Sequence, residues 1–349
     1  MKNLLVSLAG KNNVLGLSCS LVLAACGGVN ATPDAPMVPA VDAPVSAQDA
    51  PIGDTDPSAG CGLSAGPYAA GTTTEGEVMH DGMTRTFRVH VPAGYEGTAA
   101  LPLVLMFHGG GGTARQFEEA SSGMNPVADR ENFIAVYPDG TGRIQTWNGG
   151  GCCGGAVTNN VDDVGFTEAM LDHLESTLCI DRHRVFASGM SNGGIMSHRL
   201  ACELSDRFAA IAPVAGTEMS PTCTPTRPVA LMHIHGTDDG HVPFEGGMGC
   251  GPAGVAFNSV PATMERRRTI NGCASTTSRV LTEGDGTCEA YADCDADAVL
   301  CSVAGGGHNW PGGAPPAGLI DCPGNGGQST TFIASEVIWR FFAEHPRTR

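Results

Sequence analysis

The hydrophobic residues of this chain fall into short continuous runs, separated by stretches in which they recur every three or four positions. A continuous run of this length is typical of a buried strand, and the second spacing is typical of an amphipathic helix. The runs predict strands at 103–107, 133–137, 185–187, 209–214 and 229–235. The helical spacing predicts helices at 115–132, with a break or a second helix start at Pro126, at 162–178, from 195 onward, at 260–271 and at 332–342. Strands that alternate with helices indicate a mainly parallel sheet with helices on both faces and ligands beyond the carboxyl ends of the strands.

Two further segments predict antiparallel hairpins. Between residues 77 and 92, the dipeptide Asp81-Gly82 separates two β-leaning runs, which is a common hairpin signal. The second hairpin is expected from strands at 289–291 and 299–303. These elements belong to a folded part that should begin near Cys61.

The N-terminal segment has the features of an export signal. Its basic start is followed by an apolar stretch that is short for a membrane span. The stretch ends in Leu-Ala-Ala-Cys-Gly at 23–27, which resembles the lipobox of bacterial lipoproteins, where cleavage before the cysteine accompanies acylation of its sulfur. This makes 1–25 a lipoprotein-type signal peptide and Cys26 a lipid-anchored N-terminus. The alternative is an ordinary cleavage site that happens to precede a cysteine.

The composition of residues 26–60 predicts a disordered tether between this anchor and a catalytic domain at 61–349. From residue 27 onward the tether is rich in Pro, Ala and Asp and has no aromatic or basic residue, so it cannot bury enough apolar surface to offset the entropy of ordering. The whole chain has a formal net charge of −17, which argues against binding along a nucleic-acid backbone because that requires a positive surface. Contact with a membrane is expected only through the lipid anchor. The expected location is the cell envelope, as a lipoprotein, or the outside of the cell.

The cysteines predict disulfide bonds. Setting aside Cys19 and Cys26 leaves twelve of the fourteen cysteines, an even number in an exported chain. The sequence does not give their connectivity. A zinc site is the rival interpretation, but paired C-x-x-C spacings are absent and the adjacent Cys152 and Cys153 cannot easily share one tetrahedral ion, so we predict no metal.

Ser191 is the candidate nucleophile. It lies in Gly189-Met190-Ser191-Asn192-Gly193, between a predicted strand and a predicted helix, where a tight turn would expose its hydroxyl. The sequence around Ser64 has the same glycine spacing, but no apolar strand precedes it and Pro67 follows. In the remaining alternative, the glycines around Ser191 serve only close packing of the helix on the strand.

A serine nucleophile needs a base and an acid that orients the base, and in this architecture the acid comes first in the chain. His308 is the candidate base, because it lies in a loop, whereas His198, His233, His235 and His345 lie on or beside predicted helices and strands. His241 is too close to the candidate acids. The alternative is a loop histidine ordered by Trp310.

Two acids, Asp238 and Asp239, follow the strand at 229–235 and leave the choice of acid open. His233 and His235 on that strand, with His241 nearby, raise the alternative of metal ligands, but the sequence does not show how the remaining coordination positions would be filled. For the oxyanion, the expected backbone donors are the N–H groups of Asn192 and of Gly110 in the His-Gly-Gly-Gly-Gly loop at 108–112. That loop could instead be a plain flexible connection.

Seven motifs, in order, resemble the bacterial poly(3-hydroxybutyrate) depolymerase and feruloyl esterase group of carbohydrate esterase family one. They are HGGGG at 108–112, TWN at 146–148, VDDVGF at 161–166, GMSNGG at 189–194, HGTDD at 235–239 with VPF at 242–244, NGC at 271–273 and GGGHNWPGG at 305–313. The resemblance covers about residues 61–345. It implies an α/β-hydrolase fold, a triad of Ser191, Asp239 and His308, and a substrate groove near Trp147 and Trp310. This chain departs from the pattern in Asp238, in Gly240 where proline is common, and in additional cysteines.

The expected function is therefore that of an exported serine ester hydrolase that works through an acyl-enzyme and needs no cofactor. The expected substrates are feruloyl or acetyl esters on plant polysaccharide, with polyhydroxybutyrate as the alternative polymer. Two other classes of protein stay open: a surface binding protein that keeps the hydrolase fold without the chemistry, and a metal-dependent hydrolase.

Overall fold

The computed structural model describes residues 55–63, 66–314 and 322–347. The predicted signal peptide at 1–25, Cys26, Ser64 and the tether as far as residue 54 lie outside the described residues. Within the described part, no helix combines the length and the apolar character needed to cross a bilayer.

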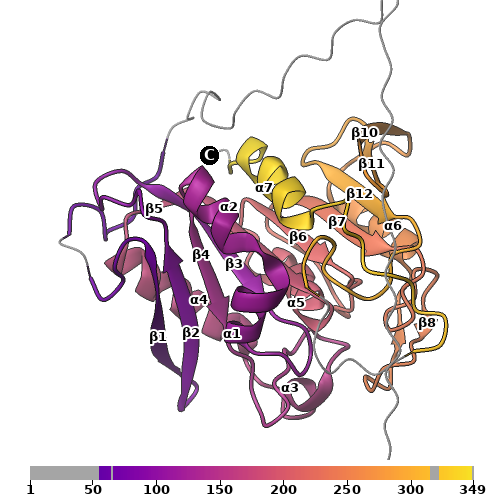
Figure 1. The fold of residues 1–349 in the computed structure, drawn as a ribbon, viewed down its shortest axis with the longest axis horizontal. Coiled ribbons are helices and arrows are strands. Elements are labelled where there is room, and N and C mark those ends of the chain that lie inside the picture. Colours follow the sequence, from indigo (N-terminus) through magenta and orange to yellow (C-terminus); the bar gives the residue numbers. More distant parts are fainter. Residues whose placement is uncertain (1–54, 64–65, 315–321, 348–349) are drawn as a thin grey trace, which may run out of the picture. The chain divides into compact units, whose positions relative to one another are not determined.

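The core of the fold is a ten-stranded sheet in the order β1-β2-β4-β3-β5-β6-β7-β12-β11-β10 (Figure 1). The six strands from β4 to β12 pair in parallel, and the strands at both edges add antiparallel pairs. The bounds are β1 Thr72–His80, β2 Met83–Val91, β3 Leu101–Phe107, β4 Ile134–Pro138, β5 Ile180–Met190, β6 Ala210–Val214, β7 Ala230–Gly236, β10 Thr277–Glu283, β11 Gly286–Tyr291 and β12 Ala298–Val303. A separate short pair consists of β8 Gly247–Met248 and β9 Ala256–Phe257.

The helices cover the two faces of this sheet in two groups. The elements are α1 Ala114–Gln116, the π-helix Phe117–Ser122, α2 Met124–Glu131, α3 Gly154–Thr158, α4 Asp163–Thr177, α5 Asn192–Glu203, α6 Val260–Ile270 and α7 Ala334–Glu344. Alternate residues of β3 show the division: Leu103 and Leu105 pack with α4, α5 and α6, whereas Val104 packs with α1, α2 and α7 (Figure 1). Because successive side chains of a strand point to opposite faces, a continuous apolar run is needed where both faces are covered. The predicted α/β-hydrolase architecture is confirmed.

The first predicted hairpin is formed by β1 and β2, with Asp81 and Gly82 at positive φ in its turn. The second is formed by β11 and β12. The outer strand β10 was not predicted, because it is a largely exposed edge strand without an apolar run. The predicted helix at 115–132 is interrupted at Gly123, whose φ of 61° ends the π-helix. The predicted second helix start near Pro126 is confirmed, because this residue lies in the first turn of α2.

The folded part begins earlier than the predicted Cys61. The N–H of Ser58 donates to the carbonyl oxygen of Ile180 at 2.8 Å, and Pro57 forms a β-bridge with Asp181. Residues 55–60 therefore lie against the start of β5 instead of belonging to the predicted tether. Their composition is that of a tether, but backbone hydrogen bonds to β5 order them.

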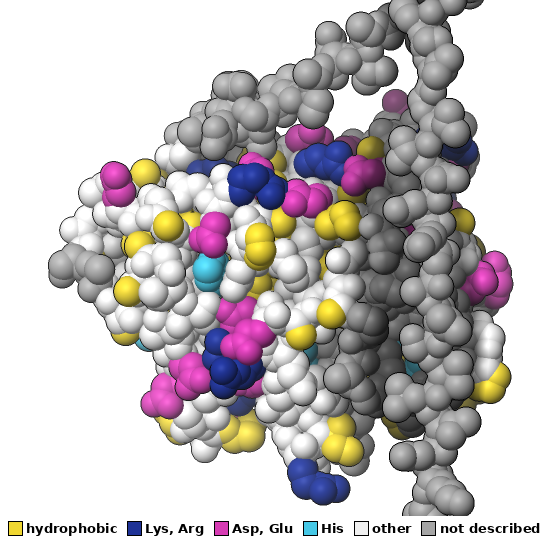
Figure 2. All heavy atoms as spheres, viewed as in Figure 1, with side chains coloured by type: hydrophobic (Ala, Val, Ile, Leu, Met, Phe, Trp, Pro, Cys, Tyr) yellow, Lys and Arg dark blue, Asp and Glu magenta, His cyan; other side chains and the backbone are white. Residues whose placement is uncertain are grey.

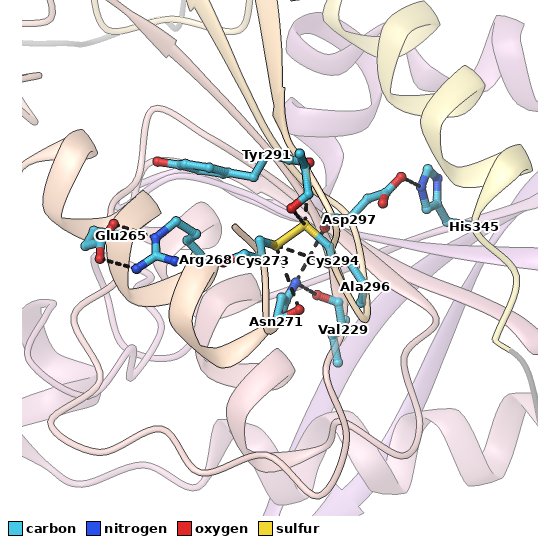
Figure 3. Close-up of a disulfide and its surroundings, with 11 residues drawn as sticks. Val229, Glu265, Arg268, Asn271, Cys273, Tyr291, Cys294, Ala296, Asp297 and His345 are labelled. Atoms are coloured by element: carbon cyan, nitrogen blue, oxygen red, sulfur yellow. Dashed lines mark hydrogen bonds and ion pairs between the residues drawn. A yellow bond between two sulfur atoms is a disulfide. The ribbon is translucent and has the colours of Figure 1, made fainter. Parts of the chain in front are cut away.

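The twelve cysteines beyond Cys26 form disulfide bonds, as predicted from their even number. The pairs are Cys61–Cys179, Cys152–Cys153, Cys202–Cys223, Cys250–Cys322, Cys273–Cys294 and Cys288–Cys301. Figure 3 shows how Cys273–Cys294 ties the segment after α6 to the connection between β11 and β12. In the same region the side-chain amide of Asn271 donates to the carbonyl oxygen of Val229 at 2.9 Å, next to the start of β7. These links fasten the antiparallel edge to the parallel core.

Charged side chains of both signs are interspersed on the face shown in Figure 2. Among the described residues, Arg88 forms ion pairs with Glu118 and Glu119, and Arg130 forms ion pairs with Glu131 and Glu336. With the net charge of −17, this face offers no extended basic surface of the kind that follows a nucleic-acid backbone.

A disulfide that closes a longer loop should stabilise the protein more, and the gain increases with the logarithm of the loop length. Cys61–Cys179 spans 118 positions and Cys288–Cys301 spans 13. In the chain-entropy account, losing the first costs about 5 kcal/mol and losing the second about 3 kcal/mol. We expect the double Cys→Ala variant of the first pair to have the lower free energy of unfolding in urea. Equal or greater destabilisation by removal of the short-loop pair would contradict this.

Candidate active site at the carboxyl ends of the parallel strands

Four loops that follow parallel strands carry the predicted site residues. Gly110 follows β3, Ser191 follows β5, Asp239 follows β7 and His308 follows β12. Phe107 pairs with Gly189, and Val303 pairs with Gly236, so these strands end level with their neighbours. The carboxyl ends of parallel strands lie at one edge of the sheet, where α/β proteins bind ligands.

Ser191 occupies a sharp turn between β5 and α5. Its φ of 55° and ψ of −120° are unusual for a residue with a side chain, and such strain concentrates at functional sites. A Cβ on Gly193 would collide with the carbonyl oxygen of Phe107, and a Cβ on Gly189 would collide with the backbone of Gly193. The two glycines are therefore required for α5 to pack this closely against β3 and β5, and the side chain of Ser191 is left partly exposed at the turn.

Asp239 and His308 form a buried hydrogen-bonded pair. The Nδ1 atom of His308 lies 2.8 Å from Oδ2 of Asp239, and the two residues are each 4% exposed. The other carboxylate oxygen accepts from the backbone N–H groups of His241 at 2.9 Å and Val242 at 2.8 Å. The carboxylate oxygens can only accept, so His308 carries its proton on Nδ1 and, when neutral, has Nε2 available as a base.

The electrostatics of Asp239 favour its ionised form. Burial alone would raise the pKa of Asp239, but the charge of His308 and the hydrogen bonds from His235 and His308 outweigh it and hold this pKa well below its usual range. By contrast, Asp238 is exposed, and its carboxylate accepts from the hydroxyl of Thr237 at 3.0 Å. Of the two acids that the sequence left open, the structure brings Asp239 to His308.

Asn325 holds the two loops of this pair together, and sequence reasoning missed it. Its Oδ1 atom accepts from the backbone N–H of Gly240 at 3.0 Å and from that of His308 at 3.0 Å. One side chain thus fixes the acid loop relative to the base loop. The residue lies in a glycine-rich segment without a chemical motif, so only the three-dimensional contact could have identified it.

Ser191 and His308 line one cavity of about 310 Å³, together with Gly110 and Asn192. Much of the remaining wall is apolar and includes Ile144, Cys153, Ile195, Val242, Phe257 and Ala253. Among the described residues that line it, none is Asp, Glu, Lys or Arg. His241 also lines the cavity and stacks on His308, with ring centroids 4.9 Å apart. The cavity therefore suits an uncharged group placed against a serine hydroxyl.

Gly110 and Asn192, which are predicted to supply the oxyanion donors, both line the same cavity. Asn192 is the first residue of α5, where backbone N–H groups have no partner within the helix. A Cβ on Gly110 would lie 3.7 Å from the Cβ of Asn192, so the two backbones are close. The loop of Gly110 is fixed by His108, whose Nε2 accepts from the N–H of Gly140 at 3.0 Å and whose Nδ1 lies 2.8 Å from the carbonyl oxygen of Gly109. Burial lowers the pKa of His108, which keeps it neutral in this role.

Trp147 and Trp310 do not fit the predicted contact with substrate, because neither side chain has exposed surface. Trp147 instead links the loop of Gly110 to the turn of Ser191. Its indole N–H donates to the carbonyl oxygen of His108 at 2.9 Å, and its backbone forms two hydrogen bonds with the side chain of Asn192. Trp310 packs on Phe117 and donates to Ser335. Motif resemblance alone does not distinguish a residue that lines a cavity from one that packs behind its lining.

The metal alternative gains no support from the geometry. His233 and His235 hydrogen-bond to one another, 3.0 Å apart, and are fully enclosed. Within the described part of the chain, the two residue groups with metal-like spacing are His241 with Cys250 and Cys322, and Glu218 with Cys202 and Cys223. In both groups the cysteines are joined in a disulfide, so their sulfurs are not thiolates.

Taken together, the parallel sheet, the turn at Ser191 and the buried acid–base pair define the class of protein as an α/β-hydrolase. An acetyl xylan esterase from Aspergillus awamori has the same fold, with a TM-score of 0.50 at 15% identity, and the match covers 70% of this chain and 96% of that one.

Sequence comparisons give the family. Residues 86–234 match the family described as esterase PHB depolymerase. The protein NocK of Nocardia uniformis subsp. tsuyamanensis, which is named as an esterase, is 33% identical over 86% of this chain and 90% of its own length. Feruloyl esterase B of Piromyces equi is 32% identical over 63% of this chain, which spans 42% of that longer protein. The chain belongs to the esterase PHB depolymerase family and is a carboxylic-ester hydrolase.

The pairing of Asp239 with His308 predicts a sharp difference between the two neighbouring acids. Asp239→Asn should lower kcat for p-nitrophenyl acetate by about 10³–10⁴-fold, because an amide no longer holds the imidazole in the required tautomer. Asp238→Asn is the matched control and should change kcat by less than about threefold, since surface changes of this kind have small effects. Steady-state kinetics of both variants would contradict the assignment if Asp238→Asn were the more damaging.

The lowered pKa of Asp239 also predicts a pH dependence of stability. A carboxylate whose pKa is depressed by folding stabilises the protein above its unfolded pKa, about 3.9, and this contribution is lost as pH falls through the folded-state pKa. In urea unfolding, the margin by which wild type exceeds Asp239→Asn should therefore shrink as pH is lowered from about 4 toward 2. A margin that grows over that interval would show that folding does not favour the ionised carboxylate.

Proposed function

We propose that this chain is an exported serine esterase that cleaves feruloyl or acetyl esters of plant polysaccharide through an acyl-enzyme. The observation that carries the proposal is the hydrogen bond between Asp239 and His308 beside the cavity that contains Ser191. This arrangement supplies a nucleophile, a base with a defined tautomer and an acid that is already ionised.

In the proposed reaction, Nε2 of His308 takes the proton of Ser191 as the hydroxyl oxygen attacks the ester carbonyl carbon. The carbonyl oxygen becomes an oxyanion, and the backbone N–H groups of Gly110 and Asn192 stabilise it. The imidazolium then gives its proton to the leaving alcohol, and the ester of Ser191 remains. Water attacks this acyl-enzyme with His308 again as base, which releases the acid and restores the serine.

The cavity supports a compact and uncharged acyl group. Its volume of about 310 Å³ is near the lower limit for ligand pockets, and its walls are mainly apolar. A single aromatic ring with short substituents, as in a feruloyl group, fits such walls, and so does an acetyl group. The similarity to a feruloyl esterase favours the aromatic ester, and the family description favours polyhydroxybutyrate as the alternative substrate.

Export is part of the proposal. Its support is the signal-like sequence at 1–25, with Cys26 as the proposed acylated residue, and the six disulfides formed by the described cysteines. Disulfides of this number persist in oxidising compartments and are rare in the cytosol.

A substrate panel tests the proposed specificity. One purified preparation should be assayed on methyl ferulate, acetylated xylan and short hydroxybutyrate oligomers. We expect kcat/KM for methyl ferulate to exceed that for the oligomers by at least about tenfold, a difference of about 1.4 kcal/mol in transition-state binding. A reversed order would favour the polyester depolymerase, and hydrolysis of none of the three would contradict the proposed substrates.

A further inference from the structure

Three buried histidines form a continuous hydrogen-bonded row that leads from α5 to the loop of Asp239. The Nε2 atom of His198 lies 3.3 Å from Nδ1 of His233, and Nε2 of His233 lies 3.0 Å from Nδ1 of His235. At the end of the row, Nε2 of His235 lies 2.8 Å from the carbonyl oxygen of Val242 and 3.4 Å from Oδ2 of Asp239. The three side chains are at most 1% exposed, and none lines the cavity of Ser191.

The acceptors at the end of the row fix the position of every proton in it. A carbonyl and a carboxylate oxygen can only accept, so Nε2 of His235 carries a proton. In a neutral ring Nδ1 of His235 then accepts, which places the proton of His233 on Nε2. The same step places the proton of His198 on Nε2. The last acceptor, Nδ1 of His198, has no hydrogen-bond partner among the described residues, as expected for the open end of a row with one direction.

The surroundings keep the first two rings uncharged. Burial lowers the pKa of His198 and of His233 well below the usual value, and nearby positive charge lowers both further. Part of this charge is on the buried side chain of Arg267, whose Nε lies 2.8 Å from Oε2 of Glu218. The same guanidinium donates to the carbonyl oxygen of His198 at 2.7 Å. A neutral imidazole donates from one nitrogen and accepts at the other, so each ring fixes which nitrogen of the next ring carries the proton. The row is therefore suited to holding the ring of His235 in one tautomer and orientation.

We propose that this row of His198, His233 and His235 is a positioning device for the triad acid. Nε2 of His235 lies 3.4 Å from the same carboxylate oxygen that binds His308. Its N–H donates to the carbonyl oxygen of Val242, whose own N–H binds the other carboxylate oxygen. His233 and His198 keep the ring of His235 in the required tautomer and orientation. The inference rests on the proposed function, because it assigns a role relative to the acid of that triad.

The row explains why one histidine beside Asp239 would not be enough. Without His233, Nδ1 of His235 would be a buried acceptor without a partner, which costs about 1–3 kcal/mol. Rotation of the His235 ring would then relieve this cost, withdraw its N–H from the carbonyl oxygen of Val242 and move Nε2 away from Asp239. Replacing the imidazole of His233 should therefore disturb the position of Asp239, although His235 lies between these two residues in the row.

Variants of His233 test the proposal. His233→Phe keeps an aromatic ring but removes the donor, and should lower kcat for p-nitrophenyl acetate about tenfold with KM unchanged within about twofold, the equivalent of one hydrogen bond. His233→Gln restores an N–H near the Nε2 position and should recover most of the loss. Equal damage by His233→Phe and His233→Gln, or no loss in His233→Phe, would overturn the proposal.

Asn271→Ala provides the structural control. It removes the buried hydrogen bond to Val229 beside the start of β7, the strand that carries His233 and His235 (Figure 3). This variant should lower the free energy of unfolding and leave kcat unchanged within about twofold. If instead it lowered kcat as much as an equally destabilised His233→Phe variant, the row would serve stability alone and the proposal would fail.

Nitrogen NMR of wild type with labelled histidine gives a readout independent of activity. Between pH 6 and 8, we expect the rings of His198 and His233 to be neutral with the proton on Nε2, and Nε2 of His235 to carry the proton that it donates to Val242. A proton on Nδ1 of His233 or His235 would overturn the row even in an active enzyme. A wild-type protein that hydrolyses no ester would contradict the proposed function, and the NMR result would still decide the alignment of the row.

Discussion

The hydrogen bond between His308 and Asp239 is the interaction on which the rest of the site depends. It joins two loops that are separated by 69 positions and become neighbours only because β7 and β12 pair in parallel. Both partners are buried, so either one alone would leave a polar group without compensation. The backbone N–H groups of His241 and Val242 bind the other oxygen of the carboxylate, and the side chain of Asn325 holds the two loops together. The pair is consequently both a folding constraint and the source of an oriented imidazole.

A second constraint relates this pair to the nucleophile. The glycines on both sides of Ser191 let α5 approach β3, and Trp147 connects the loop of Gly110 with Asn192. The donors proposed for the oxyanion are therefore fixed by buried contacts before a substrate binds. Catalysis by ester hydrolases relies on such preorganised donors, because they need not reorient when charge develops. The row of histidines extends the same principle to the acid.

The sequence could predict the features that are encoded locally. Continuous apolar runs identified the central strands, and glycine spacing with a strand before it and a helix after it identified Ser191. The exposed strand β10 lacked such a pattern, and the order of residues 55–60 depends on contacts with β5, which lies far along the chain. Burial of Trp147, the bridge through Asn325 and the alignment of three histidines likewise arise from tertiary packing. Resemblance could rank Asp239 above Asp238, but only coordinates show which carboxylate contacts His308.

The central claim is that Ser191 is the nucleophile of an acyl-enzyme mechanism. Reaction of the folded protein with a fluorophosphonate, followed by peptide mass spectrometry, tests this most directly because the reagent bonds covalently to an activated serine oxygen. If Ser191 is the nucleophile, one phosphonyl group is expected, on Ser191, and it should be lost in Ser191→Ala but not in Ser64→Ala. A label on another serine, or no label on folded and disulfide-bonded wild type, would contradict it.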